Sequence, residues 1–140
     1  MRSLSMLCAI LLTCGASCSR LDRARECRAL SSEVNSALDE IEHVYKDGQR
    51  DAATFRDVAA RYEQLAERVA LLAFSSPEVK AGVEEYRGIL LSAAKSAYAV
   101  AVALEKQDLR AVANAKLELE RLGRREKVSV LKIDSECNSP

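Results

Sequence analysis

The chain has 140 residues, a length that suits a single domain. Its 21 Lys and Arg residues balance its 21 Asp and Glu residues, so it lacks the strongly basic surface of many nucleic-acid binders, and we expect no nucleic-acid partner. Hydrophobic residues make up 49% of the chain and charged residues 30%, which excludes a disordered polyelectrolyte, while 5 Gly and 2 Pro are too few for an all-β fold built on tight turns.

The N-terminal segment predicts a cleaved export signal. Arg2 precedes a short apolar run over residues 4–12, and small residues follow up to Cys18. A run of about ten apolar residues is too short to span a bilayer. The run also lacks the alternating faces of an amphipathic helix, although a buried N-terminal helix is the alternative interpretation.

Residues 15–18, Gly-Ala-Ser-Cys, resemble the signal of bacterial lipoproteins, in which a diacylglycerol is attached to the cysteine that becomes the mature N-terminus. The resemblance covers only the signal. It implies a signal peptide over residues 1–17, lipidation of Cys18, and a short tether over residues 18–23. It also implies that a membrane is one partner of the protein.

The lipoprotein pattern is imperfect, and two other processing sites stay open. Gly15 stands where an aliphatic residue is usual, whereas a competing site ending at Cys14 has the aliphatic residue but a Thr before the cysteine. Ordinary cleavage after Ala16 is the second alternative, and it implies a periplasmic or secreted protein. Ser19 is similar to outer-membrane sorting signals, because it is not the Asp associated with inner-membrane retention.

The cysteine count favours a disulfide in the mature protein. Cleavage before Cys18 removes Cys8 and Cys14, and Cys18 then carries the lipid. Cys27 and Cys137 remain, an even pair in an oxidising compartment, and we expect them to be bonded to each other. Two unconnected thiols are the alternative.

Four segments show the spacing of amphipathic helices, because their apolar residues recur in alternating steps of three and four. Turn residues at 47–49, Ser76-Pro77 and Asp108 separate the segments, and Asp51 or Thr54, Ser76 and Asp108 are the expected N-caps. We favour helix through residue 133 in the fourth segment, with an extended tail over residues 127–133 as the alternative. The apolar stripes are Cys27, Leu30, Val34, Leu38, Ile41 and Val44; Phe55, Val58, Tyr62, Leu65, Val69 and Leu72; Val79, Val83, Tyr86, Leu90, Ala93, Ala97, Val100 and Leu104; and Leu109, Val112, Ala115, Leu119 and Leu122.

Short connections between long helices predict an all-α fold, an antiparallel up-down-up-down four-helix bundle over residues 24–137, with a tail at 138–140. An even number of antiparallel helices brings the start of the first and the end of the fourth together. Cys27 and Cys137 then lie at the same end of the bundle. A bond between them closes a loop of about 110 residues. In the chain-entropy model such a bond increases the free energy of unfolding by on the order of 4–5 kcal/mol.

The balanced total charge hides an asymmetry. Residues 19–28 hold four Arg against two acidic residues, and residues 121–132 hold five Lys and Arg against one Glu. In the predicted bundle both segments lie at the anchored end. There, each cation that contacts anionic headgroups contributes about 1 kcal/mol to the free energy of membrane binding. A solvated face that complements the dipole of the fourth helix is the alternative. The candidate membrane-surface contacts are Arg20, Arg23, Arg25, Arg124, Arg125 and Lys127.

A second apolar face on the third helix is a candidate partner contact. Leu91, Tyr98 and Val102 align with one another outside the main stripe, and Lys95 lies among them. A helix that is apolar over most of its circumference is usually buried, so a wider core is one interpretation. The other is a docking face for a partner protein or a second copy of the chain.

The sequence lacks the residue sets on which most catalytic and metal sites depend. His43 is the only histidine, on the polar side of its helix, and we expect it to be an exposed residue without a chemical role. A ferritin-like site needs a Glu-x-x-His motif from each of two helices, which one histidine cannot supply. We therefore expect no enzymatic activity and no cofactor.

These observations lead to two hypotheses. The first is a small exported, lipid-anchored helical bundle that serves as a structural or protein-interaction module of the cell envelope, at the outer membrane rather than the inner. The second is a periplasmic or secreted carrier of a small apolar ligand held between the helices. The small residues that would line its cavity are Gly82, Gly88, Ala93 and Ala97.

Overall fold

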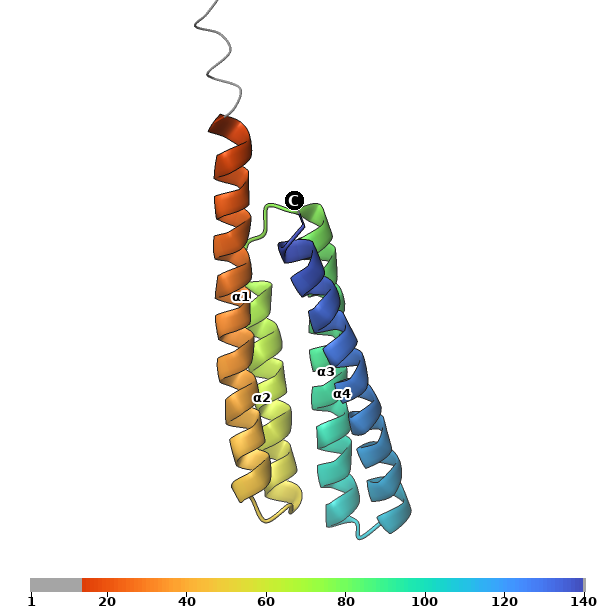
Figure 1. Ribbon diagram of the computed structural model, residues 1–140. Coiled ribbons are helices and arrows are strands. Elements are labelled where there is room, and N and C mark those ends of the chain that lie inside the picture. The colour runs from red at the N-terminus through yellow and green to blue at the C-terminus, as the bar shows by residue number, and fades with distance from the viewer. Residues whose placement is uncertain (1–13, 140) are drawn as a thin grey trace, which may run out of the picture.

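The structure is a computed structural model that describes residues 14–139, with side chains from Arg20 onward (Figure 1). Within this part of the chain there are four helices and no strand: α1 (Cys14–Asp47), α2 (Ala52–Ala70), α3 (Pro77–Glu105) and α4 (Leu109–Cys137). The predicted antiparallel four-helix bundle is confirmed. The apolar run at residues 4–12 lies outside the described residues. The side chains of Cys14 and Cys18, the two candidate lipidation sites, are also outside the described part of the structure.

Three of the helices begin at the N-caps that their sequences predict. The side chains of Asp51, Ser76 and Asp108 accept hydrogen bonds from backbone N–H groups three residues later, at 2.8, 3.3 and 2.9 Å. Each bond satisfies one of the donors that a helix start leaves unpaired. Because these caps are local, the chain stops and restarts its helices where turn residues occur in the sequence.

Two helices are longer than the sequence analysis predicts. Helix α1 begins at Cys14 rather than near residue 24, so the backbone of the expected tether at 18–23 is helical. This stretch has no Gly or Pro and is rich in good helix formers. Helix α4 continues through Cys137, which makes residues 127–133 helical rather than extended. Its later turns are stabilised by Ile133, whose apolar side chain is buried in the bundle.

Helix α3 lies at the centre of the fold, between α2 and α4. Its length and composition alone would let it cross a membrane, a property that it shares with many core helices of bundles. One of its faces packs against α2 through Val79, Val83 and Leu90, which are almost fully buried. Another packs against Leu122 of α4 through Ile89 and Ala93. These contacts are those of a core helix.

The bundle is asymmetric because α1 packs mainly on α2 and α4 mainly on α3. Figure 1 shows the four helices as two pairs, α1 with α2 and α3 with α4. Helices α1 and α4 have few contacts with each other, and the Cys27–Cys137 disulfide joins them at one end. A regular four-helix bundle would close this side as well, so here one seam is left open.

Candidate functional site

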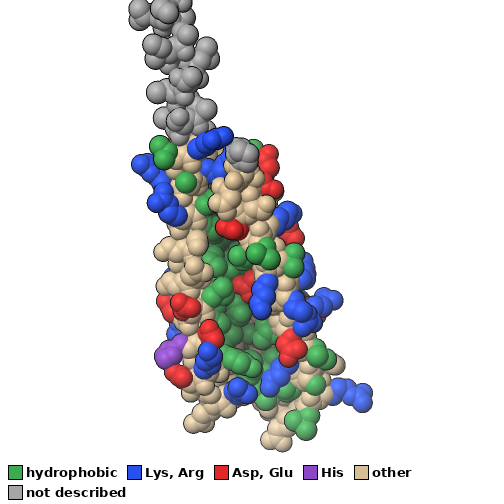
Figure 2. All heavy atoms as spheres, viewed as in Figure 1, with side chains coloured by type: hydrophobic (Ala, Val, Ile, Leu, Met, Phe, Trp, Pro, Cys, Tyr) green, Lys and Arg blue, Asp and Glu red, His purple; other side chains and the backbone are tan. Residues whose placement is uncertain are grey.

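The open seam forms an apolar groove between α1 and α4, which we call the α1–α4 groove. Figure 2 shows hydrophobic side chains in the hollow between the two helix pairs. Three hollows of about 180, 760 and 330 Å³ follow one another from the disulfide end to the opposite end. Val130 and Leu131 line the first two hollows, and Leu38 and Glu120 line the second and third, so the groove is continuous.

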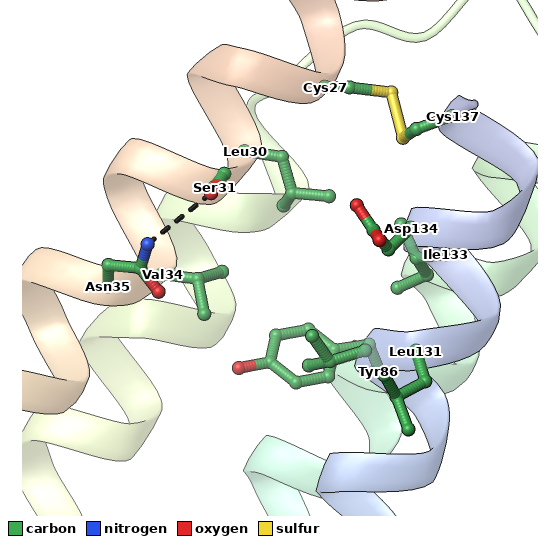
Figure 3. Close-up of a pocket in the computed structure, with 11 residues that line it drawn as sticks. Cys27, Leu30, Ser31, Val34, Asn35, Tyr86, Leu131, Ile133, Asp134 and Cys137 are labelled. Atoms are coloured by element: carbon green, nitrogen blue, oxygen red, sulfur yellow. Dashed lines mark hydrogen bonds between the residues drawn. A yellow bond between two sulfur atoms is a disulfide. The ribbon is translucent and has the colours of Figure 1, made fainter.

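A disulfide closes one end of the groove, as the cysteine count predicts. Cys27 and Cys137 are bonded, with their Cα atoms 6.1 Å apart. In Figure 3 the bond lies above the first hollow, where Leu30 and Val34 of α1 face Tyr86 of α3 and Ile133 of α4. The groove is thus blind at this end and open to solvent along its length.

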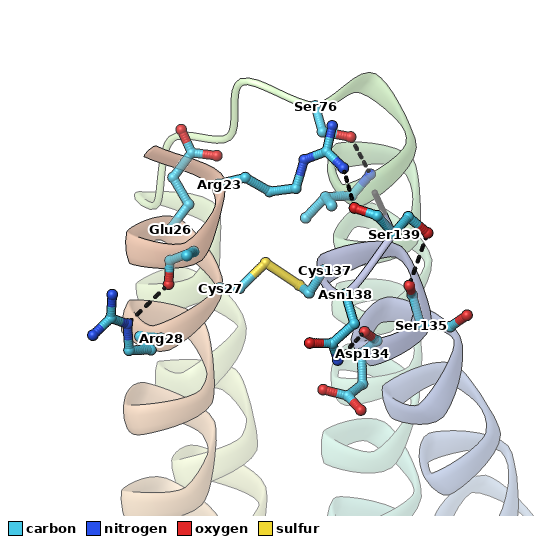
Figure 4. Close-up of a disulfide and its surroundings, with 12 residues drawn as sticks. Arg23, Glu26, Cys27, Arg28, Ser76, Asp134, Ser135, Cys137, Asn138 and Ser139 are labelled. Carbon is cyan, nitrogen blue, oxygen red and sulfur yellow. Dashed lines mark hydrogen bonds between the residues drawn. A yellow bond between two sulfur atoms is a disulfide. The ribbon is translucent and has the colours of Figure 1, made fainter. Parts of the chain in front are cut away.

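Two polar contacts reinforce the same end, and Figure 4 shows the first of them, between Arg23 and Ser139. The Arg23 guanidinium donates a 3.2 Å hydrogen bond to the backbone oxygen of Ser139, which links α1 to the C-terminal end of the chain. The Glu26 carboxylate accepts hydrogen bonds from the backbone N–H and hydroxyl of Ser75, at 2.9 and 3.1 Å. At the disulfide end, helix α1 is therefore held both to the connection between α2 and α3 and to the end of the chain that follows α4.

A carboxyl group and two phenols meet in the groove. The Tyr86 hydroxyl donates a 3.0 Å hydrogen bond to Oε1 of Glu126. Burial raises the pKa of Glu126, which the Tyr86 bond and the charge of Lys127 partly offset. Burial, followed by the charge of Glu126, raises the pKa of Tyr62 to about 12, and the same two causes raise the pKa of Tyr86. At neutral pH both phenols are protonated donors beside the carboxyl.

Glu126 is not among the site residues that the sequence predicts, because it stands inside a basic segment. A signal was present nonetheless. Leu122, Ser129 and Ile133 are buried on α4, and Glu126 continues their spacing of three and four. A carboxyl on the apolar stripe of a helix is the type of residue that marks a binding site.

Charges of both signs lie along the edges of the groove. Glu42 on α1 and Glu120 on α4 are acidic, and Lys116 and Lys127 on α4 are basic. The side chain of Leu131, on the α4 edge, is 69% exposed. An exposed leucine next to an apolar groove is characteristic of a surface that a partner covers.

The six candidate membrane contacts form two separate groups. Arg23 lies at the disulfide end, and Arg20 and Arg25 are exposed nearby on α1. Arg124 and Lys127 are 13 and 10 residues before Cys137, which places them about 15–20 Å away along α4. Both of them line the groove. Arg124 and Arg125 also line a separate hollow of about 350 Å³, together with Glu85, Arg121 and Lys132.

The candidate face on α3 is partly exposed. Leu91 and Tyr98 keep 43% and 51% of their surface, Lys95 is exposed, and Val102 is half-buried. The guanidinium of Arg56 lies 5.0 Å from the centre of the Tyr98 ring and covers part of it. The neighbouring side chains Ile89, Ala94 and Ala101 are buried, so for these three the wider core is confirmed.

The four small residues proposed to line a ligand cavity do not lie along the α1–α4 groove. Ala93 and Ala97 are buried in the core, and Gly88 is exposed. A Cβ atom on Gly82 would meet Cγ1 of Ile133 at 3.0 Å. At Gly82 the missing side chain therefore lets a neighbouring helix pack closely.

His43 is exposed, as expected, and its Nδ1 lies 2.9 Å from the Asp47 carboxylate one helical turn away. Among the described residues, no three His, Cys, Asp or Glu side chains lie close enough together to hold a metal ion. No protein-family model, curated protein or solved structure matches the chain.

Proposed function

We propose that the protein is an exported, lipid-anchored helical bundle of the cell envelope, and that it acts as a protein-interaction module through the α1–α4 groove. The observation that carries the proposal is the open apolar groove, which is fixed at one end by the Cys27–Cys137 disulfide. The disulfide also supports export, because such bonds persist in oxidising compartments.

The position of Cys18 suits an anchor. It lies on α1 nine residues before Cys27, a distance of about 14 Å along a helix. Arg20, Leu21 and Asp22 in this stretch are exposed, and Figure 1 shows α1 extending beyond the other helices. A lipid on Cys18 would therefore hold the groove away from the membrane surface and leave it accessible to a partner.

The form of the groove favours a protein partner over a small ligand. Pockets for small molecules usually enclose at least about 70% of the ligand surface. The α1–α4 groove is open to solvent along its length, and its edges carry charges of both signs. A long partner segment would cover the groove, whereas a small apolar ligand would stay partly exposed.

The anchor is tested by the intact mass of the protein extracted from membranes. We expect a mature chain that begins at Cys18 and carries the mass of the attached lipid. Cys18→Ser should abolish acylation, while Cys14→Ser, the matched control, should leave it unchanged. An unacylated protein in the soluble fraction, or loss of the lipid in Cys14→Ser only, would refute the proposed anchor.

Native mass spectrometry of the purified mature protein distinguishes the two candidate functions, a protein-interaction module and a carrier of a small apolar ligand. We expect the mass of the polypeptide with its attached lipid and no further small molecule. A stoichiometric apolar compound that co-purifies with the protein would favour the carrier instead.

A further inference from the structure

Glu126 places a charge on the floor of an otherwise apolar groove. Within the described residues, the only hydrogen bond that its side chain accepts is the one from Tyr86. A carboxylate has sites for about four hydrogen bonds, so the described groups of the chain itself leave most of those of Glu126 free for an occupant or solvent. A half-buried anion with one neutral donor is costly, and a cation brought by the occupant of the groove would offset that cost.

The groove has the length and the kind of walls that a bound helix requires. Its α1 wall includes the sixteen residues from Leu30 to Tyr45, and the two ends of this stretch lie about 22 Å apart along the helix. Both walls are helices, whose side-chain ridges accept the ridges of a third helix packed between them. Peptide helices bind to apolar grooves in this way through residues spaced three, four and seven apart.

As a refinement of the interaction module proposed above, we propose that the groove binds an amphipathic helix of a partner protein. This helix is about four turns long and places a Lys or Arg from its apolar face against Glu126. The mixed charges of Glu42, Lys116, Glu120 and Lys127 then face its polar sides.

A second copy of the chain fits the groove less well. The apolar side chains of its candidate contact face, Leu91 and Tyr98, lie on α3, which is flanked by α2 and α4 in its own bundle. Only a narrow ridge of α3 is thus available, and Arg56 covers part of Tyr98. The groove accepts a helix that is free on both sides.

The occupant is identified by photo-crosslinking the full-length protein in the cells that make it. One variant carries a benzophenone amino acid at Leu131 on the groove edge. The matched control carries it at Leu117, on the same helix but not among the residues that line the groove; the two leucines are 69% and 62% exposed. We expect a polypeptide adduct about tenfold more abundant from Leu131, and mass spectrometry should map it to an amphipathic helix with a Lys or Arg on its apolar face.

The role of Glu126 is tested in the same assay. Glu126→Gln keeps the size of the side chain and removes its charge. We expect it to reduce the adduct about tenfold, the change that 1.4 kcal/mol produces. Glu118→Gln, whose parent carboxylate pairs with Arg121 away from the groove, should leave the adduct unchanged. Circular dichroism confirms that each variant is folded.

The remaining outcomes all overturn the inference. A crosslinked pair of copies of this chain would make the occupant a second copy. An adduct only with lipid, equal adducts from Leu131 and Leu117, or no adduct at all would refute a helix in the groove and the protein-interaction module with it. A partner segment that is not helical, lacks a cation or is insensitive to Glu126→Gln would refute the inference alone.

Discussion

The hydroxyl of Tyr86 on α3 donates a 3.0 Å hydrogen bond to the carboxylate of Glu126 on α4, at the floor of a groove that α1 and α4 leave open. This pair combines the features that set the groove apart from an ordinary helix seam. It is polar within an apolar surface, it lies largely out of water, and it has hydrogen-bonding capacity to spare. Binding at such a position is favourable only for an occupant with a complementary group.

The first prediction concerns pH. Burial raises the pKa of Glu126 in the folded protein above its ordinary value of 4.5. The folded state therefore holds the proton of the Glu126 carboxyl more tightly than the unfolded state does. The stability that this difference contributes is fully present below pH 4.5 and is lost as the pH rises through the raised pKa. Glu126→Gln avoids the loss, so we expect it to increase the free energy of unfolding at pH 7 by about 1 kcal/mol or less, since the group is partly exposed.

Urea denaturation at pH 4 and pH 7 measures this difference. The gain should be present at pH 7 and shrink at pH 4, and Glu118→Gln should show no such dependence on pH. A Glu126→Gln variant less stable than the native protein at pH 7 would contradict the prediction. Together with weaker crosslinking, a stability gain would indicate that Glu126 is kept for binding rather than for folding.

The second prediction concerns the disulfide. Replacing Cys27 and Cys137 by Ala should reduce the free energy of unfolding by about 2–5 kcal/mol, because the bond closes a loop with a sequence separation of 110 residues. Chemical denaturation with and without reductant measures the loss. Reductant should destabilise the native protein and leave the double variant unchanged; equal stability of the two oxidised proteins would show the prediction to be wrong.

The third prediction is that loss of the disulfide loosens α1 more than α3. Helix α1 packs mainly on α2, whereas α3 is buried between two neighbours. Amide exchange in the double Ala variant should therefore accelerate at Leu30 and Val34 more than at Leu90 and Ala97. Uniform acceleration in both helices would mean that the whole bundle opens as one unit.

The fourth prediction compares two leucines of α2 and its C-cap. Leu65 is fully buried, and Leu71 is 85% exposed. Leu65→Ala removes buried methyl groups and leaves a cavity, and we expect it to cost about 2–5 kcal/mol of unfolding free energy. Leu71→Ala should change that free energy by less than about 0.5 kcal/mol. Thermal unfolding monitored by circular dichroism ranks the two, and a similar cost at both positions would contradict the observed packing.

The fifth prediction concerns the start of α4. The Asp108 carboxylate accepts a 2.9 Å hydrogen bond from the Ala111 N–H. Asp108→Ala removes this cap and should reduce the free energy of unfolding by about 1 kcal/mol, while Asp108→Asn, which preserves a cap acceptor, should change it little. Urea denaturation of both variants provides the test; an equal loss in Ala and Asn would point to the charge rather than the cap.

The sequence alone determined the features that depend on local order along the chain. The spacing of Leu30, Val34 and Ile41 indicates a helix, since helical periodicity is a property of neighbours three and four residues apart. The caps at Ser76 and Asp108 are local in the same sense. Even the Cys27–Cys137 bond could be expected from the cysteine count together with the even number of helices, which brings these two ends together.

Only the tertiary structure decided how the four helices divide their contacts. Periodicity shows which face of a helix is apolar, but the rotation and tilt of each helix depend on side-chain volumes across several interfaces at once. For this reason the sequence did not reveal that α1 would leave α4 uncovered, that Ile133 would pack over Gly82, or that Glu126 would lie at the floor of the groove.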